Sequence, residues 1–267
     1  MNQQRSAAFF DLDKTIIAKS STLAFSKPFF EGGLLSRRAV LRSAYAQFMF
    51  SINGADHDQL ERMRAYLTQM VAGWDVEVVR KSVAETLHSI IDPIVFEEAV
   101  ELIEHHQAAG RDVVIVSASG SEVVEPIGAM LGVDHVIATT LVAENGRYTG
   151  DVEFYAYGPN KAKAMQELAV ERGYDLADSY AYSDSETDAP MLAAVGHPFA
   201  VNPDKTLRRM ADENGWPILI FARPVALRRR LGLDTKVGKA AAVAVVAGAV
   251  SAITVALVTR RKHKVAA

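Results

Sequence analysis

Short apolar runs alternate along the chain with amphipathic stretches that end at glycine. Five of the runs are typical of buried strands, at residues 7–10, 112–116, 136–138, 180–182 and 198–201. Four helices are predicted between them, at residues 96–109, 122–131, 161–172 and 189–195, each followed by a glycine. Buried strands that alternate with helices favour a parallel sheet with helices on both faces. The pattern therefore predicts an α/β fold with a doubly wound parallel sheet.

Two segments interrupt this alternation. Residues 18–95 contain no clear strand but have amphipathic stretches at 35–50 and 60–72, so we expect a helical insert. An insert directly after the first strand would lie over the carboxyl edge of the sheet, where open α/β folds bind their ligands. Residues 141–150 hold an Asn-Gly pair between short extended pieces, which predicts a β-hairpin.

Charge is unevenly distributed along the chain. The 267 residues carry a net charge of -3, of which residues 223–267 contribute +9, from ten Lys and Arg against one acid, leaving -12 for residues 1–222. The acidic bulk argues against nucleic-acid binding, and the basic tail favours an anionic membrane surface. Because the chain has no cysteine, any metal site uses oxygen or histidine ligands.

The basic tail contains a run of 19 residues, 240–258, without a charged side chain. This length suits one membrane-spanning helix between a basic linker at 223–239 and a basic tail at 259–267. Because the run is rich in alanine, a peripheral helix or a helix packed against a partner stays an alternative. The positive charges beside the run favour a main domain that faces the cytoplasm. Small residues at a spacing of four could pack two such helices in a homodimer: Ala240, Ala244, Gly248, Ala252 and Ala256.

Two acidic loops follow strands of the predicted sheet. In the first, Asp11, Asp13 and Thr15 occupy alternate positions directly after the first strand. Carboxylates this close repel each other unless a cation holds them, although a solvated acidic turn also explains the pattern. The second loop, after the fourth strand, contains Asp184 and Asp188. Oxygen ligands from two loops suit Mg²⁺, so the sequence predicts a magnesium site at this edge.

Further polar side chains are predicted at the same edge. Ser117 directly follows the second strand, where its hydroxyl could bind a phosphate at a helix start. Ser119 or Ser121 is predicted to cap the helix that comes next. Lys161 opens a later helix, with Asn160 as its predicted cap. A cation at a helix N-terminus opposes the helix dipole by about 0.3–1 kcal/mol, which favours a functional role for this lysine.

These motifs form an ordered set. The D-x-D-x-T loop, the strand followed by serine, the lysine and the D-x-x-x-D loop resemble the haloacid dehalogenase (HAD) superfamily of phosphatases. The resemblance covers about residues 7–222 and implies a Rossmann-like catalytic core at 1–17 and 96–222 with a helical cap at 18–95. The position of the insert and the segments at 201–204 and 215–218 are similar to subfamily IB, the branch that contains phosphoserine phosphatases.

The resemblance implies a reaction through a phosphorylated aspartate. Asp11 would be the nucleophile and Asp13 the acid and base of a Mg²⁺-dependent phosphomonoester hydrolase. Mg²⁺ would be held by Asp11, Asp184 and the backbone carbonyl of Asp13. Asp188 would orient the metal shell, and Thr15 would brace the loop.

Substrate binding is implied by the same comparison. Ser117 and Lys161 would bind the phosphoryl oxygens of the substrate. Phosphoserine phosphatases carry a glutamate in the insert where this chain has Ser20, and paired glycines where it has Ala118 and Ser119. Phosphoserine is therefore a weakened candidate, and we expect a small phosphorylated metabolite or a lipid precursor.

Two other functions stay open. The chain could be a membrane-anchored regulatory or binding protein that retains the phosphatase fold, or a phosphotransferase that uses an alcohol acceptor. The related ion-pumping ATPases lack an acid at the position of Asp13, so its presence favours a hydrolase.

Overall fold

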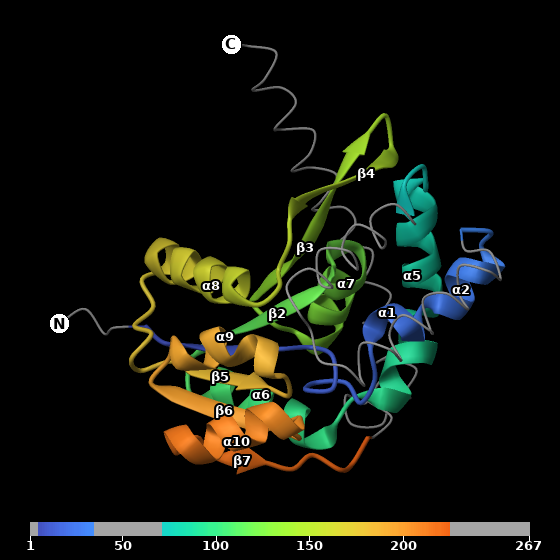
Figure 1. Ribbon diagram of the computed structural model, residues 1–267. Helices are drawn as coiled ribbons and strands as arrows, with labels where there is room; N and C mark the ends of the chain where they lie inside the picture. The colour runs from blue at the N-terminus through green and yellow to red at the C-terminus, as the bar shows by residue number, and fades with distance from the viewer. Residues whose placement is uncertain (1–4, 35–70, 225–267) are drawn as a thin grey trace, which may run out of the picture. The chain divides into compact units, whose positions relative to one another are not determined.

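The computed structural model describes residues 5–34 and 71–224, which lie within one compact unit, Met1–Val225 (Figure 1). The second unit, Ala226–Ala267, is outside the described residues, and so are the predicted membrane span at 240–258 and the tail at 259–267. The predicted insert helices at 35–50 and 60–72 also fall almost wholly outside them. Within the two described ranges, no helix combines the length and apolar character that a membrane crossing needs.

A seven-stranded sheet forms the centre of the described unit, in the order β4-β3-β2-β1-β5-β6-β7. The strands are β1 (Ala7–Phe10), β2 (Asp112–Gly120), β3 (His135–Glu144), β4 (Arg147–Phe154), β5 (Tyr180–Ser183), β6 (His197–Val201) and β7 (Ile218–Leu219). Every neighbouring pair is parallel except β3 and β4. The predicted α/β class and mostly parallel sheet are confirmed, with all five predicted strands in place.

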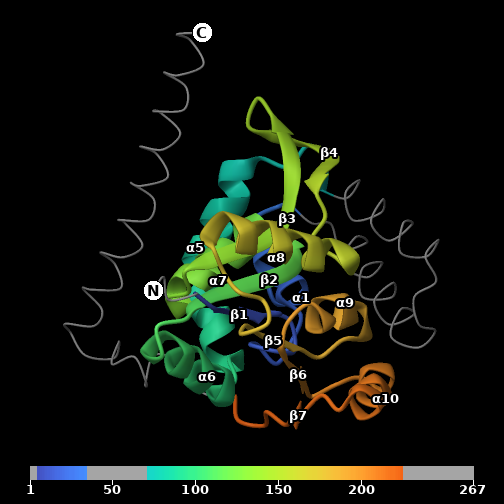
Figure 2. The same ribbon diagram turned by 90° about the vertical axis from the view of Figure 1, so that its left-hand side faces the viewer.

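Helices cover both faces of the sheet (Figure 2). On one face lie α8 (Pro159–Arg172), α9 (Ala189–Ala193) and α10 (Lys205–Asn214), and on the other lie α6 (Glu97–Ala108) and α7 (Ser121–Leu131). On the first face, Phe9 packs in one buried cluster with Met165, Met191 and Leu207. On the second, Phe10 meets His106 edge to face. Successive residues of β1 therefore bury opposite faces, which accounts for its unbroken apolar run.

The predicted third strand and the predicted hairpin are parts of one structure. β3 is a single strand that pairs with β2 in its first half and with β4 in its second. The turn between β3 and β4 lies at Asn145 and Gly146, whose φ angles of 50° and 79° are those that a two-residue hairpin turn needs. The hairpin also receives a hydrogen bond from the insert, since the Val76 N–H donates to the Gly146 carbonyl at 3.0 Å.

The described part of the insert is helical, as predicted, with α1 (Ser21–Ala24), α2 (Ser26–Glu31), α5 (Val76–Ile91) and the short η1 (Asp92–Ile94). Its two connections to the core lie side by side. The Ala18 N–H donates to the Ile94 carbonyl at 2.7 Å, and the Phe96 N–H donates to the Ile16 carbonyl at 2.9 Å. Helix α1 therefore begins close to the loop that follows β1.

Candidate active site

Backbone hydrogen bonds hold the loop after β1, both to β5 and within the loop. The Asp11 N–H donates to the Tyr182 carbonyl of β5 at 2.9 Å, so the loop starts where the sheet ends. The Leu12 carbonyl accepts from Ile16 N and Ile17 N at 2.9 and 3.0 Å, which turns the chain sharply. Lys14 lies within this turn and has a φ of 64°, a left-handed conformation that a lysine rarely adopts. Such strain is concentrated at functional sites.

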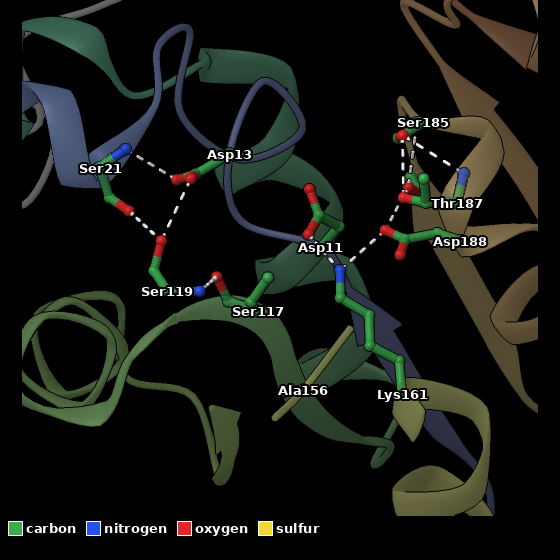
Figure 3. Close-up of polar contacts among 12 residues, drawn as sticks. Asp11, Asp13, Ser21, Ser117, Ser119, Ala156, Lys161, Ser185, Thr187 and Asp188 are labelled. Carbon is green, nitrogen blue, oxygen red and sulfur yellow. Dashed lines mark hydrogen bonds and ion pairs between the residues drawn. The ribbon is translucent and has the colours of Figure 1, made fainter. Parts of the chain in front are cut away.

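Lys161 joins the two acidic loops. Its Nζ lies 2.6 Å from Asp11 Oδ1 and 2.8 Å from Asp188 Oδ2, and its side chain is 3% exposed (Figure 3). Ser183 Oγ also donates to Asp188 Oδ2, at 2.7 Å. Burial acts to lower the pKa of Lys161, but the attraction of the two carboxylates outweighs it and raises the pKa above its ordinary value. The lysine is therefore a fixed cation beside the nucleophile candidate.

The first turn of α8 differs from the prediction in its cap. Gly158, with a φ of 54°, is the residue before the helix, and Pro159 is its first residue. Asn160 was predicted as the cap, which is wrong: its side chain donates to the Tyr155 carbonyl at 3.0 Å, outside the helix. The proline has no N–H to satisfy, and the next two N–H groups donate to backbone carbonyls, Asn160 N to Tyr157 and Lys161 N to Gly158, both at 3.1 Å. The helix therefore starts without a side-chain cap.

Asp184 is a buried carboxylate without a donor. It is 8% exposed, and no group among residues 5–34 and 71–224 donates a hydrogen bond to its side chain. Burial, with repulsion from Asp11, raises the pKa of Asp184 to about 8. Burial likewise raises the pKa of Asp11 to about 7, against the attraction of Lys161.

This donor set fits Mg²⁺. Asp11 and Asp184 are buried close enough to repel each other, and Lys161 contacts only one of them. No cluster of three or more His, Asp or Glu side chains with metal-site geometry occurs in the part of the chain that the structure describes. Mg²⁺ is usually bound by one or two carboxylates and keeps several waters, so it needs no such cluster. Asp188 was predicted in the metal shell, which stays a prediction; the structure places its Oδ2 against Lys161 and Ser183.

Asp13 is held on both carboxylate oxygens. Its Oδ1 accepts from Ser21 N at 2.8 Å, and its Oδ2 accepts from Ser119 Oγ at 3.2 Å (Figure 3). Burial raises the pKa of Asp13, and these hydrogen bonds act in the opposite direction. Ser119 was one of two serines predicted to cap α7. That prediction is wrong for both Ser119 and Ser121, because α7 begins after Gly120 without a side-chain cap.

The other predicted site residues lie at the same edge. Ser117 is 1% exposed at the end of the buried run of β2, and its Oγ accepts from Ser119 N at 3.2 Å. Thr15 is fully buried, and its Oγ1 has no hydrogen-bond partner among the described residues. Its N–H donates to the Leu12 carbonyl at 3.4 Å. The structure therefore brings together the ends of β1, β2 and β5 and the start of α8, where all seven predicted residues lie.

Besides Ser119, which was predicted only as a helix cap, the prediction missed two residues that contact the site. Ser183 is the last residue of β5, directly before Asp184, and its hydroxyl donates to Asp188. Its place at the end of a strand could have indicated that it lies at the site. Ser21 comes from the insert, and nothing in its spacing from Asp13 signals the contact. Its hydroxyl lies 2.7 Å from that of Ser119, from which it is 98 positions distant.

Known proteins match this chain closely. The sequence pattern of the haloacid dehalogenase-like hydrolases matches residues 8–193. An inhibition of morphological differentiation protein of Streptomyces azureus is 60% identical over 98% of this chain and 96% of its own length. A probable phosphatase of Mycobacterium tuberculosis is 59% identical over 96% of this chain and 90% of its own length.

More distant matches agree with these. A phosphoserine phosphatase of M. tuberculosis is 32% identical over 97% of this chain and 82% of its own length. A crystal structure of a Bordetella pertussis protein of unknown function covers 81% of this chain and 99% of its own, with a TM-score of 0.72 and 29% identity. The chain belongs to the haloacid dehalogenase-like hydrolases, on their phosphoserine phosphatase-like branch, and is a phosphatase of that family.

Proposed function

We propose that this protein is a Mg²⁺-dependent phosphomonoester hydrolase that acts through a phosphorylated Asp11. The observation that carries the proposal is the arrangement around Lys161. A buried cation holds one oxygen of Asp11, and Asp13 is held two residues further on. Asp184 is buried, with no hydrogen-bond donor to its side chain among the described residues. A nucleophile, an acid/base group and two metal-binding carboxylates are thus supplied within one edge of the sheet.

In the first half of the reaction, a carboxylate oxygen of Asp11 attacks phosphorus. The bond between phosphorus and the ester oxygen breaks, and Asp13 gives its proton to that leaving oxygen. Lys161 and Ser117 hold the phosphoryl oxygens, and Asp188 keeps Lys161 in place through the 2.8 Å contact. Asp11, Asp184 and the Asp13 backbone carbonyl would hold Mg²⁺, which would supply positive charge that offsets the repulsion between carboxylate and phosphate.

In the second half, Asp13 is ionised and takes a proton from a water molecule. That water attacks phosphorus, the bond to Asp11 breaks, and inorganic phosphate leaves with Asp11 again a carboxylate. One residue is therefore acid in one step and base in the next, which suits a carboxyl group whose pKa is raised by burial.

The substrate that we propose is a small phosphorylated metabolite or a lipid precursor. One of the relatives is named a phosphoserine phosphatase. This chain has Ser20 and Ser119 where such enzymes carry glutamate and glycine, which argues for a different leaving group. A binding protein that retains the fold, or a phosphotransferase to an alcohol, are the competing proposals.

We further propose that residues 240–258 anchor the enzyme in a membrane, with the catalytic unit facing the cytoplasm. The support is the uncharged run and the basic segments on both sides of it. The small-residue ridge in that run is the basis for proposing a homodimer. Recovery of all of the full-length protein in the soluble fraction after lysis would contradict the anchor.

A panel of phosphometabolites and phospholipids tests the activity on the purified full-length chain in detergent. We expect release of phosphate that requires Mg²⁺, a preference visible in kcat/KM, and covalent labelling that Asp11→Asn abolishes. A binding protein would release no phosphate from any compound. A phosphotransferase would turn over faster with added alcohol and transfer the phosphate to it.

A further inference from the structure

Ser119 connects Asp13 to the insert. Its hydroxyl lies 3.2 Å from Asp13 Oδ2 and 2.7 Å from Ser21 Oγ (Figure 3). The Thr22 hydroxyl lies 3.3 Å from it. An ionised carboxylate only accepts hydrogen bonds, and a hydroxyl has one proton to give. When Asp13 is ionised, the Ser119 proton therefore points at Asp13, and Ser119 accepts from the hydroxyls of the insert.

The backbone around Ser119 is built to aim this side chain. The pairing of β2 with β3 shifts register between Ser117 and Gly120, and such an irregularity redirects side chains at a sheet edge. Two hydrogen bonds stabilise the backbone at this shift. Thr139 Oγ1 donates to the Ala118 carbonyl at 2.7 Å, and Ser119 N donates to Ser117 Oγ at 3.2 Å. Ser119 itself is 8% exposed, so its hydroxyl has little contact with solvent.

The contacts of Asp13 are divided between two elements. The backbone N–H of Ser21, at the start of α1, donates to one oxygen, and the Ser119 hydroxyl donates to the other. The backbone donor persists in every variant of Ser21 except proline, whereas the second donor depends on the Ser119 side chain alone. Of the two, only the Ser119 hydroxyl can be removed without changing the main chain.

We propose that Ser119 is a positioning residue: its hydroxyl holds the Asp13 carboxyl group where it delivers a proton to the leaving oxygen of the substrate. This inference rests on the proposed phosphatase function. The proton passes from Asp13 to the ester oxygen while the bond from phosphorus to Asp11 forms and the bond to the ester oxygen breaks. A basic alkoxide needs that proton to leave, whereas p-nitrophenolate leaves without it.

The test compares two phosphate esters on the full-length protein. Ser119→Ala should lower kcat/KM for glycerol 2-phosphate by about tenfold or more, which is part of the roughly 10²- to 10⁴-fold that general acid catalysis contributes. It should change kcat/KM for p-nitrophenyl phosphate by less than about twofold, because kcat/KM reports only the steps up to cleavage of the ester bond. Ser119→Thr keeps the hydroxyl and should recover most of the activity on the alkyl ester.

Ser121→Ala is the matched control. Ser121 is two positions further on, at the first residue of α7, and its hydroxyl donates to Glu122 Oε2 at 3.2 Å rather than to Asp13. We expect this variant to leave the ratio of the two esters unchanged. If Ser119→Ala lowered both esters equally, or neither, the positioning role would be wrong and the hydroxyl would serve only the local structure.

A double variant distinguishes an effect of Ser119 through Asp13 from a general effect on the structure. In the Asp13→Asn background, Ser119→Ala should cost less than about a further twofold on glycerol 2-phosphate, because the group that it positions has gone. A further loss as large as in the wild type would overturn the inference. Absence of phosphate release by the wild type would instead refute the proposed function, so the two failures are distinguishable.

Discussion

Lys161 Nζ lies 2.6 Å from Asp11 Oδ1, although the two residues are 150 positions apart. The contact exists because β1 and the N-terminus of α8 meet at the carboxyl edge of one parallel sheet. It is buried, and the same amino group also holds Asp188. Removing one member of a buried ion pair costs more than the pair contributes, since the remaining charges lose their partner.

Replacement of this lysine should therefore weaken the fold as well as the reaction. Lys161→Met leaves two buried carboxylates without their cation, so we expect the free energy of unfolding at neutral pH to fall by about 3–5 kcal/mol. Urea unfolding measures the change. Lys163→Met is the control, because the Lys163 side chain is 75% exposed and its ion pair with Glu167, at 3.9 Å, is on the surface. This variant should change the free energy of unfolding by less than about 0.5 kcal/mol. Equal effects in both variants would contradict the buried ion pair.

Asp13→Asn should separate catalysis from metal binding. The amide cannot donate a proton to a leaving alkoxide or accept one from water, so we expect turnover of alkyl phosphates to fall by about 10²-fold or more. The backbone carbonyl is unchanged, so the rise in Tm that Mg²⁺ produces should persist. Turnover at the wild-type rate would remove Asp13 from the acid/base role.

Mg²⁺ should stabilise the protein through Asp184. The carboxylate is buried and has no hydrogen-bond donor within residues 5–34 and 71–224, so a bound cation would compensate its charge. Mg²⁺ at 100 times its Kd should add about 2.7 kcal/mol to the free energy of unfolding. Asp184→Asn should abolish this gain and should be more stable than the wild type in chelator, while exposed Asp178→Asn should match the wild type in both conditions. A gain from Mg²⁺ that survived in Asp184→Asn would disprove the assignment.

The same carboxylate predicts the pH dependence of the metal-free protein. Asp184 has an ordinary pKa of 3.8 when unfolded and a pKa of about 8 when folded, because burial disfavours its ionised form. Between these values the folded state binds more protons than the unfolded state, so stability falls as pH rises. Thermal unfolding in chelator from pH 4 to 8 measures this decline, which should be shallower in Asp184→Asn. A stability that rose over this interval would contradict the buried, uncompensated carboxyl.

A buried hydrogen bond supports the strands beneath the site. Tyr182 OH lies 2.8 Å from His106 Nε2, and the other ring nitrogen accepts from Arg111 Nε at 2.9 Å, so His106 Nε2 carries the proton and donates to the tyrosine. Tyr182→Phe leaves that N–H without an acceptor and should lower the free energy of unfolding by about 1–3 kcal/mol in urea. Tyr180→Phe, on the same strand, removes a hydroxyl without a hydrogen-bond partner among the described residues and should cost less. The reverse order would contradict this account.

Local sequence was sufficient for most of the core. An apolar run such as residues 7–10 forms a strand wherever both faces of a sheet are covered, and a glycine such as Gly132, with a φ of 69°, ends a helix by its own conformational freedom. The order of the motifs was likewise enough to gather Asp11, Ser117, Lys161 and Asp184 at one edge. Parallel strands all end on the same side, so the residues that follow them meet.

Contacts between side chains distant in sequence were decided only by the tertiary structure. Ser119 was predicted as a helix cap, because serine is strongly preferred directly before a helix, where its oxygen accepts from a free N–H. In the structure, the register of β2 against β3 shifts at this point, and Ser21 of the insert lies beside Ser119. The Ser119 hydroxyl therefore donates to Asp13 instead of capping the helix. The sequence alone determined which residues stand at the carboxyl edge, because period and turn chemistry are local. Which of these side chains contact one another depends on how the insert packs against the sheet. That packing results from many residues together, so no single position of the sequence indicates it.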